Sequence, residues 1–379
     1  MSEPVVAPPG LKNVIVADTS IGEVRGAEGF FHYRPYDATE LATQRTFEEC
    51  WHLLFDGRLP TADELSRFRA EIAGQRQIPE PVAAVLPQIA SVGSDRQTLQ
   101  RLRTALSQLG SAEAFAPVWG ADPARVRADA LRLAAVTPAI QAALYRLRNG
   151  EEPIAPEPGL SAGANWLHMI TGQIPTAEHE RAINTYLGLT IEHGFNASTF
   201  TARVVASSGS DVASAVCAAI GTFVGPLHGG APDRALDALD EIGSPDRVRE
   251  WARAKITTGA RIMGFGHGVY TTEDPRARTL REVARDLGGP LADFAIATET
   301  EIVAALAELK PGRNLYANVE FYAGVVMEQC GVPRALFTPT FACARVVGWG
   351  AHIIEQSQET KIFRPLARYV GLPAPQPLD

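Results

Sequence analysis

The apolar residues of the chain recur mostly at helical spacing. Leucines at positions 99, 102, 106 and 109 fall three or four residues apart, which places them on one face of a helix. Ser94 and Gln97 fit a capping box in front of this run, and Gly110 follows it as a residue suited to ending helices. The pattern therefore predicts an amphipathic helix that begins after Ser94 and stops at Gly110.

Other helix starts are marked by side chains that can cap free backbone N–H groups. Two capping boxes and two Asp-Pro pairs mark further helices: Thr46 with Glu49, Thr61 with Glu64, Asp122-Pro123 and Asp274-Pro275. Short β-branched stretches such as residues 14–16 could pair as a small sheet, and no series of alternating strands is present in the sequence. The chain is predicted to be mostly α, with at most a small β element near the N-terminus.

Composition places the chain among globular proteins. It has 379 residues, 46% of them hydrophobic and 21% charged, which is enough for two domains or for one large core with an insertion. The formal net charge of -8 repels phosphate backbones and anionic lipid, so neither nucleic acid nor a membrane is an expected partner. The longest charge-free run, residues 212–232, meets Gly225 and Pro226 after its apolar part, which favours a buried helix over a membrane span.

The N-terminus and the cysteines indicate a cytoplasmic setting. The first residues, MSEPVVAPPG, lack the basic and apolar regions of an export signal. The cysteines lie far apart without a CxxC pair, so neither a zinc framework nor a redox motif is predicted: Cys50, Cys217, Cys330 and Cys343. We expect a cytoplasmic protein with reduced, mostly buried thiols.

Two glycine-rich links in the second half of the chain each hold one histidine. His228 stands in GPLHGG, after an apolar helix and before Pro232, which can begin the next helix. His267 stands in GFGHG, whose glycines let the backbone approach a ligand closely, although GxGxxG spacing and a phosphate-loop Lys are absent from the motif. Taken alone, each is compatible with a hydrogen-bonded loop histidine as well as with a functional one.

Three charged residues occupy positions that packing alone does not favour. Arg276 falls near the second position of a predicted helix, where the helix dipole disfavours a cation, so a bound anion or a salt bridge is expected beside it. Glu320, in the first turn after Asn318, either complements the dipole or takes part in chemistry. Arg345 lies in an apolar helix and needs a partner, which is either a protein carboxylate or an anionic substrate.

Two other patterns do not predict catalytic or metal sites. His352 and Glu355 are three residues apart, but without an HExxH motif or a third ligand they predict a partly exposed helix face. The segment 207–211 is not a GxSxG elbow and is predicted to be a loop followed by an N-cap. No metal site is predicted.

In chain order, these segments join others in one ordered set. The set comprises Gly10-Leu11, EHGFNAST at 192–199, GPLHGGA at 225–231, GFGH at 264–267, DPRA at 274–277, NVEFYAG at 318–324, FTPTFACARVVGW at 337–349 and IFRP at 362–365. Their order and spacing resemble the citrate synthase family, in its shorter prokaryotic form, over nearly the full length. The resemblance implies a helical homodimer with a large domain of residues 1–226 and 324–379 and a small domain of residues 227–323.

The resemblance also implies a reaction in the cleft between the domains. Such enzymes condense the methyl group of acetyl-CoA with the ketone of oxaloacetate and hydrolyse the thioester to citrate and CoA, with no metal or other cofactor. In this reaction a carboxylate can remove the methyl proton, and hydrogen-bond donors can stabilise the enolate and ketone oxygens. Guanidinium groups can bind the two carboxylates of oxaloacetate. The matching catalytic residues are His228, His267 and Glu320; the oxaloacetate-binding residues are His193, Arg276, Arg345 and the partner subunit's Arg364; the CoA-binding residues are Met263, Gly264, Phe265 and Gly266.

The chain departs from the family pattern at several of these positions. Glu320 stands where the family usually has Asp, and its extra methylene shifts the carboxylate by about a bond length. Gly268 and Thr271 stand where cations near the CoA phosphates are usual, and Ala317 replaces a proline. Nearby cations that could substitute are Lys255, Arg261, Arg278 and Arg313.

These departures leave alternatives beside the main interpretation. We expect citrate synthase activity. A 2-methylcitrate synthase using propionyl-CoA is the first alternative, because the acyl pocket is not evident from the sequence. A dicarboxylate-binding paralogue with little condensing activity is the second, because Glu320, Gly268 and Thr271 all bear on catalysis or on CoA binding.

Overall fold

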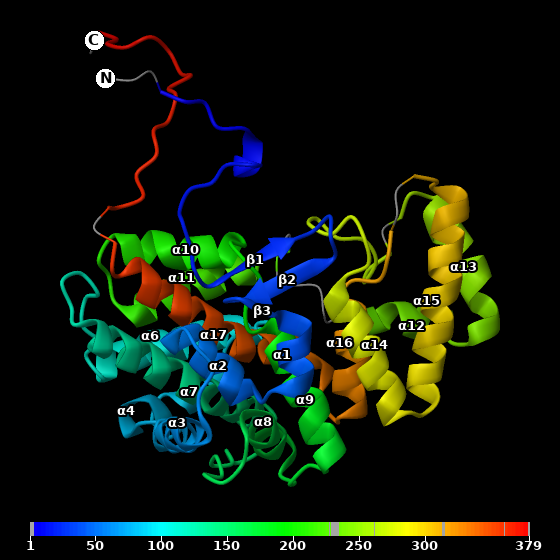
Figure 1. Cartoon of the computed structure of the whole chain (residues 1–379), viewed down its shortest axis with the longest axis horizontal. Helices are drawn as coiled ribbons and strands as arrows, with labels where there is room; N and C mark the ends of the chain where they lie inside the picture. The colour runs from blue at the N-terminus through cyan, green and yellow to red at the C-terminus, as the bar shows by residue number, and fades with distance from the viewer. Residues whose placement is uncertain are drawn as a thin grey trace.

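The computed structural model describes residues 4–226, 228, 235–260, 262–312, 315–359 and 361–377. Over these residues the chain is mostly α, as predicted, with one small sheet close to the N-terminus. The helices form a large body and a smaller lobe that extends to one side of it (Figure 1).

The helices of the large body come from both ends of the sequence. They are α1 (Ala38–Gln44), α2 (Phe47–Asp56), α3 (Ala62–Gly74), α4 (Glu80–Ala83), α5 (Leu86–Ser91), α6 (Thr98–Ala112), α7 (Pro123–Arg148), α8 (Ala162–Thr171), α9 (Ala177–Thr190), α10 (Ala197–Ser207), α11 (Val212–Phe223) and α17 (Phe337–Gln356). The lobe and its junction with the body contain α12 (Ala235–Ile242), α13 (Val248–Thr257), α14 (Pro275–Leu287), α15 (Pro290–Leu309) and α16 (Val319–Gln329). Short 3-10 turns cover Pro9–Leu11, Pro245–Arg247 and Arg334–Leu336.

Helix α17 is the centre of the large body. Its residues are apolar on nearly all sides, which is typical of a helix surrounded by others. It contacts α7, α9, α10 and α11. Because α17 carries Arg345, this packing decides which groups surround that buried cation.

A second hydrophobic cluster lies in the lobe. It is built on α13 and α15 and is separate from the main core: Ile242, Val248, Ala252, Ile256, Ile262, Ile302, Ala305 and Leu306. Helices α14 and α16 instead contribute buried residues to the main cluster, among them Leu280 and Phe321. They therefore connect the lobe to the body.

The sheet is antiparallel, with strand order β1 (Gly22–Arg25), β2 (Phe30–Tyr33) and β3 (Tyr36–Asp37). In the register, Val24 is opposite Phe31 and Tyr33 is opposite Tyr36. The strand predicted at residues 14–16 is wrong, because that segment lies outside the sheet and Ile15 is exposed. Beyond the end of β1, the carbonyl oxygen of Gly26 accepts a hydrogen bond from the backbone N–H of Thr271 at 3.2 Å, so the sheet rests on the segment that follows His267.

Most of the predicted helix starts are confirmed. Both capping boxes form, at Thr46 and at Thr61, and both Asp-Pro pairs open helices with the aspartate as N-cap. The start predicted at Ser94 is wrong, because α6 begins only at Thr98. The predicted stop at Gly110 is also wrong: the helix continues through this residue, where a Cβ would lie 2.5 Å from the Cβ of Ala213. Gly110 thus allows close packing of α6 against α11.

The two terminal segments leave the large body side by side (Figure 1). They carry several exposed apolar side chains: Val5, Val6, Leu366, Val370 and Leu372. Among the described residues, none of the helices combines the length and the apolar character needed to cross a bilayer.

Candidate active site

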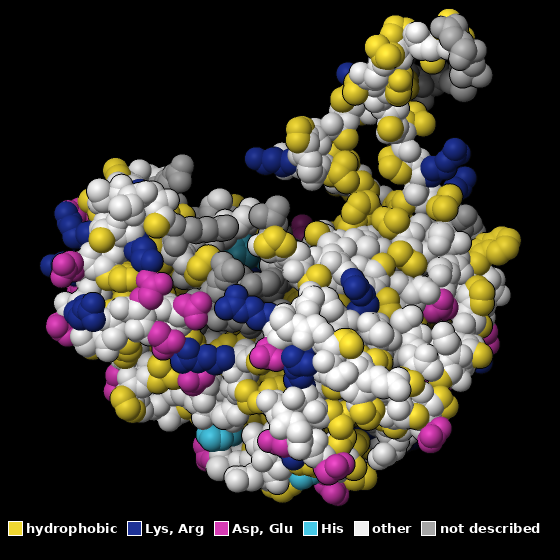
Figure 2. Space-filling model, turned by 180° about the vertical axis from the view of Figure 1, so that it is seen from behind, with side chains coloured by type: hydrophobic (Ala, Val, Ile, Leu, Met, Phe, Trp, Pro, Cys, Tyr) yellow, Lys and Arg dark blue, Asp and Glu magenta, His cyan; other side chains and the backbone are white. Residues whose placement is uncertain are grey.

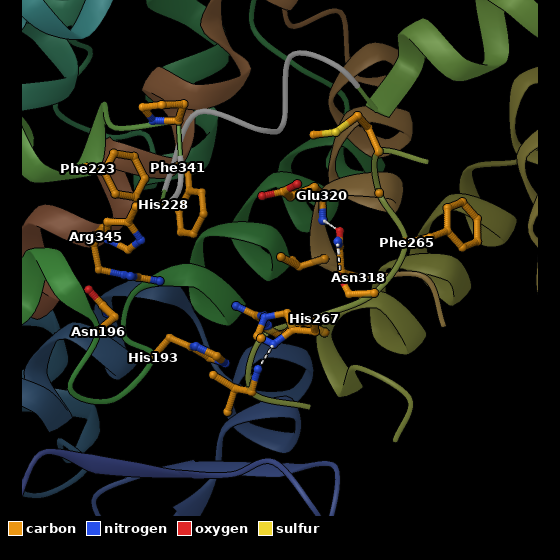
Figure 3. Close-up of a pocket in the computed structure, with 18 of the residues that line it drawn as sticks. His193, Asn196, Phe223, His228, Phe265, His267, Asn318, Glu320, Phe341 and Arg345 are labelled. Atoms are coloured by element: carbon orange, nitrogen blue, oxygen red, sulfur yellow. Dashed lines mark hydrogen bonds between the residues drawn. The ribbon is translucent and has the colours of Figure 1, made fainter. Parts of the chain in front are cut away.

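A cavity of about 350 Å³ opens where the lobe meets the body. Figure 2 shows the molecule hollowed between the two, and Figure 3 shows the side chains around the cavity. Ten of the predicted site residues line it: His193, His228, Met263, Gly264, Phe265, Gly266, His267, Arg276, Glu320 and Arg345. Segments distant in sequence therefore meet at one site.

The segment 263–266 is held against the start of α16 by backbone hydrogen bonds. The N–H of Asn318 donates to the carbonyl of Gly264 at 2.8 Å, and its side-chain amide donates to the carbonyl of Gly266 at 2.9 Å. Gly264 has φ of 82° and Gly266 has φ of 84°, in the left-handed region that favours glycine. The glycines let this strand-like segment follow the N-terminus of α16 closely.

Arg276 and Asp274 form a buried ion pair at the start of α14. The Nε and Nη2 atoms of Arg276 donate to the two carboxylate oxygens of Asp274, at 3.0 and 2.8 Å. The backbone N–H of Val319 donates to the same carboxylate at 3.1 Å, so Asp274 connects the starts of α14 and α16. Burial opposes ionisation of Asp274, but the Arg276 charge more than offsets it and holds the pKa of Asp274 below its usual value.

Arg345 projects from α17 with only part of its guanidinium satisfied. Its Nε donates to the carbonyl of Thr190 at 2.9 Å, and its guanidinium carbon lies 4.8 Å from the ring centre of Phe341. Its buried Nη2 has no hydrogen-bond partner among the described residues. Burial lowers the pKa of Arg345, although the charge of Glu192 acts in the opposite direction. The group is a buried donor beside the cavity.

His267 is held as a neutral ring with its proton directed away from the backbone. Its Nδ1 accepts hydrogen bonds from the N–H groups of Val269 at 2.9 Å and Tyr270 at 3.1 Å, so the ring proton lies on Nε2. That nitrogen is 3.2 Å from Nη2 of Arg276. The Nε2–H of His267 and the Nη2 of Arg276 are therefore two neighbouring donors, and an oxygen atom between them would accept a hydrogen bond from each.

His228 is oriented by the start of α10. The N–H of Ser198 points to Nε2 of His228 at 3.3 Å, so this nitrogen accepts and Nδ1–H is the donor of the ring. The Oγ of Ser198 lies 2.8 Å from the same nitrogen and accepts from the indole N–H of Trp349 at 3.2 Å. Ser198 thereby fixes the ring against both α10 and α17.

Three histidines of the site are biased toward the neutral form. Desolvation and the Arg276 charge lower the pKa of His267 to about 4, although its ring is open to the cavity. Desolvation and the Arg345 charge lower the pKa of His228 to about 4. Burial, together with Arg276 and Arg345, lowers the pKa of His193, whose Nε2 is 2.9 Å from the hydroxyl of Tyr270. At neutral pH these rings serve as neutral hydrogen-bonding groups.

Glu320 lies in the first turn of α16, as its position after Asn318 predicts. Asn318 caps the helix by accepting from the backbone N–H of Glu320 at 3.0 Å. The Glu320 side chain faces the cavity across from His228 and His267 (Figure 3). A carboxylate thus stands opposite two neutral imidazoles.

Other expected contributors lie away from the cavity. Arg364 is on the exposed C-terminal segment and is not among the residues that line it. Lys255 forms an ion pair with Glu241 at 2.7 Å, and Arg278 is exposed at 4.0 Å from Glu273. The glycines at 229 and 230 and the cations Arg261 and Arg313 lie outside the described residues.

Sequence reasoning missed several groups that shape the site. Ser198, Tyr270 and Asp274 act by holding a histidine or an arginine, whereas the sequence predicts Asp274 only as a helix cap. The expectation for His352 is wrong: its side chain is fully buried instead of lying on a partly exposed face. Its neighbours are Arg203 and Glu192, from segments that sequence spacing does not connect.

The described lining of the cavity carries imidazole and guanidinium groups and one carboxylate. Among the described residues, no group of three or more His, Cys, Asp or Glu side chains is arranged to hold an ion. The four cysteines are unpaired, and three of them are buried. Guanidinium and imidazole groups therefore face one carboxylate across the cavity.

Comparison with known proteins agrees with this class of site. The family model "Citrate synthase, C-terminal domain" matches residues 10–366. The citrate synthase of a Synechocystis species is 37% identical over 374 residues, covering 98% of this chain and 92% of that protein. The 2-methylcitrate synthase of Mycobacterium tuberculosis is 37% identical over 362 residues, covering 96% and 90%.

Solved structures give the same result. Citrate synthase from Thermotoga maritima superposes with a TM-score of 0.83 at 36% identity, covering 98% of this chain and 96% of that one. The ternary complex of carboxymethyl coenzyme A and oxaloacetate with citrate synthase from Thermoplasma acidophilum has a TM-score of 0.87 at 30% identity, covering 98% and 97%. The protein is an acyl-transferring enzyme of helical fold. The chain belongs to the citrate synthase family.

Proposed function

We propose that the cavity condenses acetyl-CoA with oxaloacetate and hydrolyses the resulting thioester to citrate and CoA. The observation that carries the proposal is the grouping of three chemistries around one cavity: the Glu320 carboxylate, two neutral imidazoles and two buried guanidinium groups. A carbon acid, a carbonyl to be polarised and a dicarboxylate require these three kinds of group.

Arg276 and Arg345 would bind the carboxylates of oxaloacetate. Arg276 is held in place by Asp274, and the unpartnered Nη2 of Arg345 offers a buried donor, within the described residues, that a substrate carboxylate would satisfy. His193 lies at the same end of the cavity, neutral and held by Tyr270. The Nε2–H of His267 would donate to the ketone oxygen and polarise the carbonyl without charge on the imidazole.

Glu320 would remove a proton from the methyl group of the thioester. The Nδ1–H of His228 would donate to the thioester oxygen and stabilise the enolate that forms. The new carbon–carbon bond then forms at the polarised ketone carbon, and water cleaves the thioester to release CoA. Met263, Gly264, Phe265 and Gly266 would contact the acyl-CoA along the wall that the segment 263–266 provides.

A homodimer belongs to the same proposal. Arg364 is exposed on a terminal segment that projects from the body beside the N-terminal segment, and both carry exposed apolar residues (Figure 1). A second cavity of about 640 Å³ adjoins the first through His193 and Asn196 and is lined by Asp18 and Glu23, whose charges suit an incoming guanidinium. We propose that the partner subunit's Arg364 reaches oxaloacetate by this path. The two-domain division at residues 227 and 323 and the cytoplasmic location are part of the proposal.

The test is thiol release from acetyl-CoA and from propionyl-CoA in the presence of oxaloacetate. The expected result is release from both at unequal rates, with a higher kcat/KM for acetyl-CoA. A higher kcat/KM for propionyl-CoA would make the protein a 2-methylcitrate synthase, an outcome kept open by the equal identity to both kinds of relative. Oxaloacetate binding without thiol release would refute condensation and favour a dicarboxylate-binding paralogue.

A further inference from the structure

A buried carboxylate lies one residue before His193, which lines the cavity. The Glu192 side chain is fully buried, and neither of its oxygens has a hydrogen-bond partner among the described residues. It lies against α17 at Gly348, where a Cβ would come within 2.9 Å of Glu192 Oε2 and 2.2 Å of the Ile191 carbonyl oxygen. Only a glycine at that position allows this approach.

The position of Gly348 places Glu192 between two other residues of the same helix face. Arg345 and His352 are three residues before and four residues after Gly348, so the three lie on successive turns of α17. Arg345 is also tied to the same segment, because its Nε donates to the carbonyl of Thr190 at 2.9 Å. The Glu192 carboxylate therefore has a guanidinium one turn to one side and an imidazole one turn to the other.

A hydrogen bond from Arg203 fixes which nitrogen of the His352 ring carries the proton. The Nη1 of Arg203 donates to Nδ1 of His352 at 3.1 Å, so the ring proton lies on Nε2, which is 3.3 Å from Glu192 Oε2. Arg203 in turn donates to Glu355 at 2.5 Å. Glu355 also accepts from the hydroxyl of Thr19 and from the N–H and hydroxyl of Ser20, each at 2.8 Å.

The charged side chains around Glu192 and His352 form pairs. Arg203 is neutralised by Glu355, whose pKa is held at about 2 because hydrogen bonds from Arg203 and Ser20 more than offset its burial. The Nδ1 of His352 accepts from Arg203, which leaves its other ring nitrogen facing Glu192. Of the charges that act on Arg345, that of Glu192 does most to favour the protonated guanidinium, although the two described side chains form no direct ion pair. A buried guanidinium with no counter-charge would be very costly, so the pairing matters most when the cavity is empty.

We propose that Glu192 is the resident counter-charge of Arg345, a positioning residue that offsets the buried guanidinium charge in the empty site and thereby lowers the affinity for the dicarboxylate. The inference rests on the proposed function, in which Arg345 binds oxaloacetate. A bound carboxylate and Glu192 share one cation, and the repulsion between the two anions weakens binding. Glu192 thus stabilises the free enzyme at the expense of substrate affinity.

The first test replaces Glu192 by the uncharged Gln. Calorimetric titration with oxaloacetate, without acyl-CoA, should give a Kd about three- to tenfold lower for Glu192→Gln than for the wild type, because a negative charge near the bound dianion is removed. The ligand-free variant should melt at a lower temperature. A merely structural role would lower the melting temperature and leave Kd unchanged or higher, which would overturn the proposal.

Two matched variants separate charge from structure. Glu355→Gln removes the same charge from the residue that pairs with Arg203. This variant should have a lower melting temperature, while its Kd for oxaloacetate stays within about twofold of the wild type. Glu192→Asp keeps the charge and should retain the wild-type Kd within about twofold. An equal gain in oxaloacetate affinity in Glu355→Gln would assign the effect to net charge and would refute a specific pairing with Arg345.

A double-mutant cycle tests the pairing without substrate. Arg345→Gln leaves Glu192 without its counter-ion, so Glu192→Gln combined with Arg345→Gln should melt above the temperature expected from adding the two single effects. If Glu192→Gln alone does not fold, a double variant that folds would itself show the coupling. Additive effects would refute the pairing even if the enzyme condenses its substrates, whereas wild-type protein that does not bind oxaloacetate would refute the proposed function.

Discussion

The ion pair at the start of α14 gives the prediction that depends most directly on the tertiary structure. Asp274 is 1% exposed and Arg276 is 2% exposed. One carboxylate oxygen accepts from N–H and Nε of Arg276, and the other accepts from its Nη2 and from N–H of Val319. In Asp274→Asn, either orientation of the amide places its NH2 against two donors, and the charge of Arg276 is left uncompensated.

Breaking a buried ion pair by removing one partner costs roughly 3–5 kcal/mol of unfolding free energy. In a chain of 379 residues this corresponds to a melting temperature lower by about 5 °C at neutral pH. The pKa of Asp274 is lowered in the folded state, so the pair contributes fully above the ordinary value of 3.8, and the contribution is lost as pH falls below that value. Oxaloacetate affinity should fall as well, because Arg276 loses the group that orients it.

The control is Asp122→Asn in the other Asp-Pro helix start. Asp122 also caps its helix, accepting from the N–H of Ala124 at 2.9 Å, but it is exposed and forms no ion pair in the described structure. Asn caps helices about as well as Asp, so this variant should melt within about 1 °C of the wild type. The melting temperature and the oxaloacetate affinity of both variants are measured and compared with those of the wild type. Equal losses in the two variants would reduce Asp274 to a helix cap and refute its role in holding Arg276.

Three further predictions concern the cavity. Glu320→Gln should abolish solvent exchange of the acetyl methyl hydrogens, followed by NMR, and lower kcat by about 100-fold or more, whereas unchanged turnover would exclude Glu320 as the base. Arg345→Ala should raise the Kd of oxaloacetate by about 10-fold or more, and a lower melting temperature with unchanged Kd would eliminate its binding role. Because the pKa values of His228 and His267 are lowered to about 4, their neutral forms persist down to low pH, so kcat/KM should show no loss attributable to them between pH 8 and pH 6 and should fall only toward pH 4. A loss of activity with an apparent pKa near 6.5 that disappears in a His267 variant would contradict the third prediction.

Local hydrogen-bonding chemistry explains which elements were predictable. The capping boxes at Thr46 and Thr61 and the caps at Asp122 and Asp274 involve residues within three positions of each other, and all four form. The start expected at Ser94 formed only in part: the Gln97 side chain accepts from the N–H of Ser94, as in a capping box, but the N–H of Gln97 donates to the Ser94 carbonyl in a turn, and the helix begins at Thr98. A favourable local pattern therefore does not by itself decide where a helix begins.

The candidate site was predictable only in part, for the same reason. Sequence chemistry singled out Arg345 as a buried cation in need of a partner, but whether that partner was protein or substrate stayed open. In the structure Glu192 lies against the same helix at Gly348, and Arg345 also lines the cavity, so candidate partners of both kinds are present. The burial of His352 was missed because its neighbours Arg203 and Glu192 come from segments about 150 residues away along the chain.

The sequence by itself determined the helical character of the chain, most helix starts and the residue types of the cavity, because caps, apolar periodicity and side-chain chemistry act over a few neighbouring positions. The tertiary structure decided how the charges pair, which tautomers the histidines adopt and which glycines permit close contact. Those properties depend on distances between segments that meet only when α10, α14, α16 and α17 pack together. A buried charge is stabilised by whatever the fold places within a few ångströms of it, and that distance is not a local property of the chain.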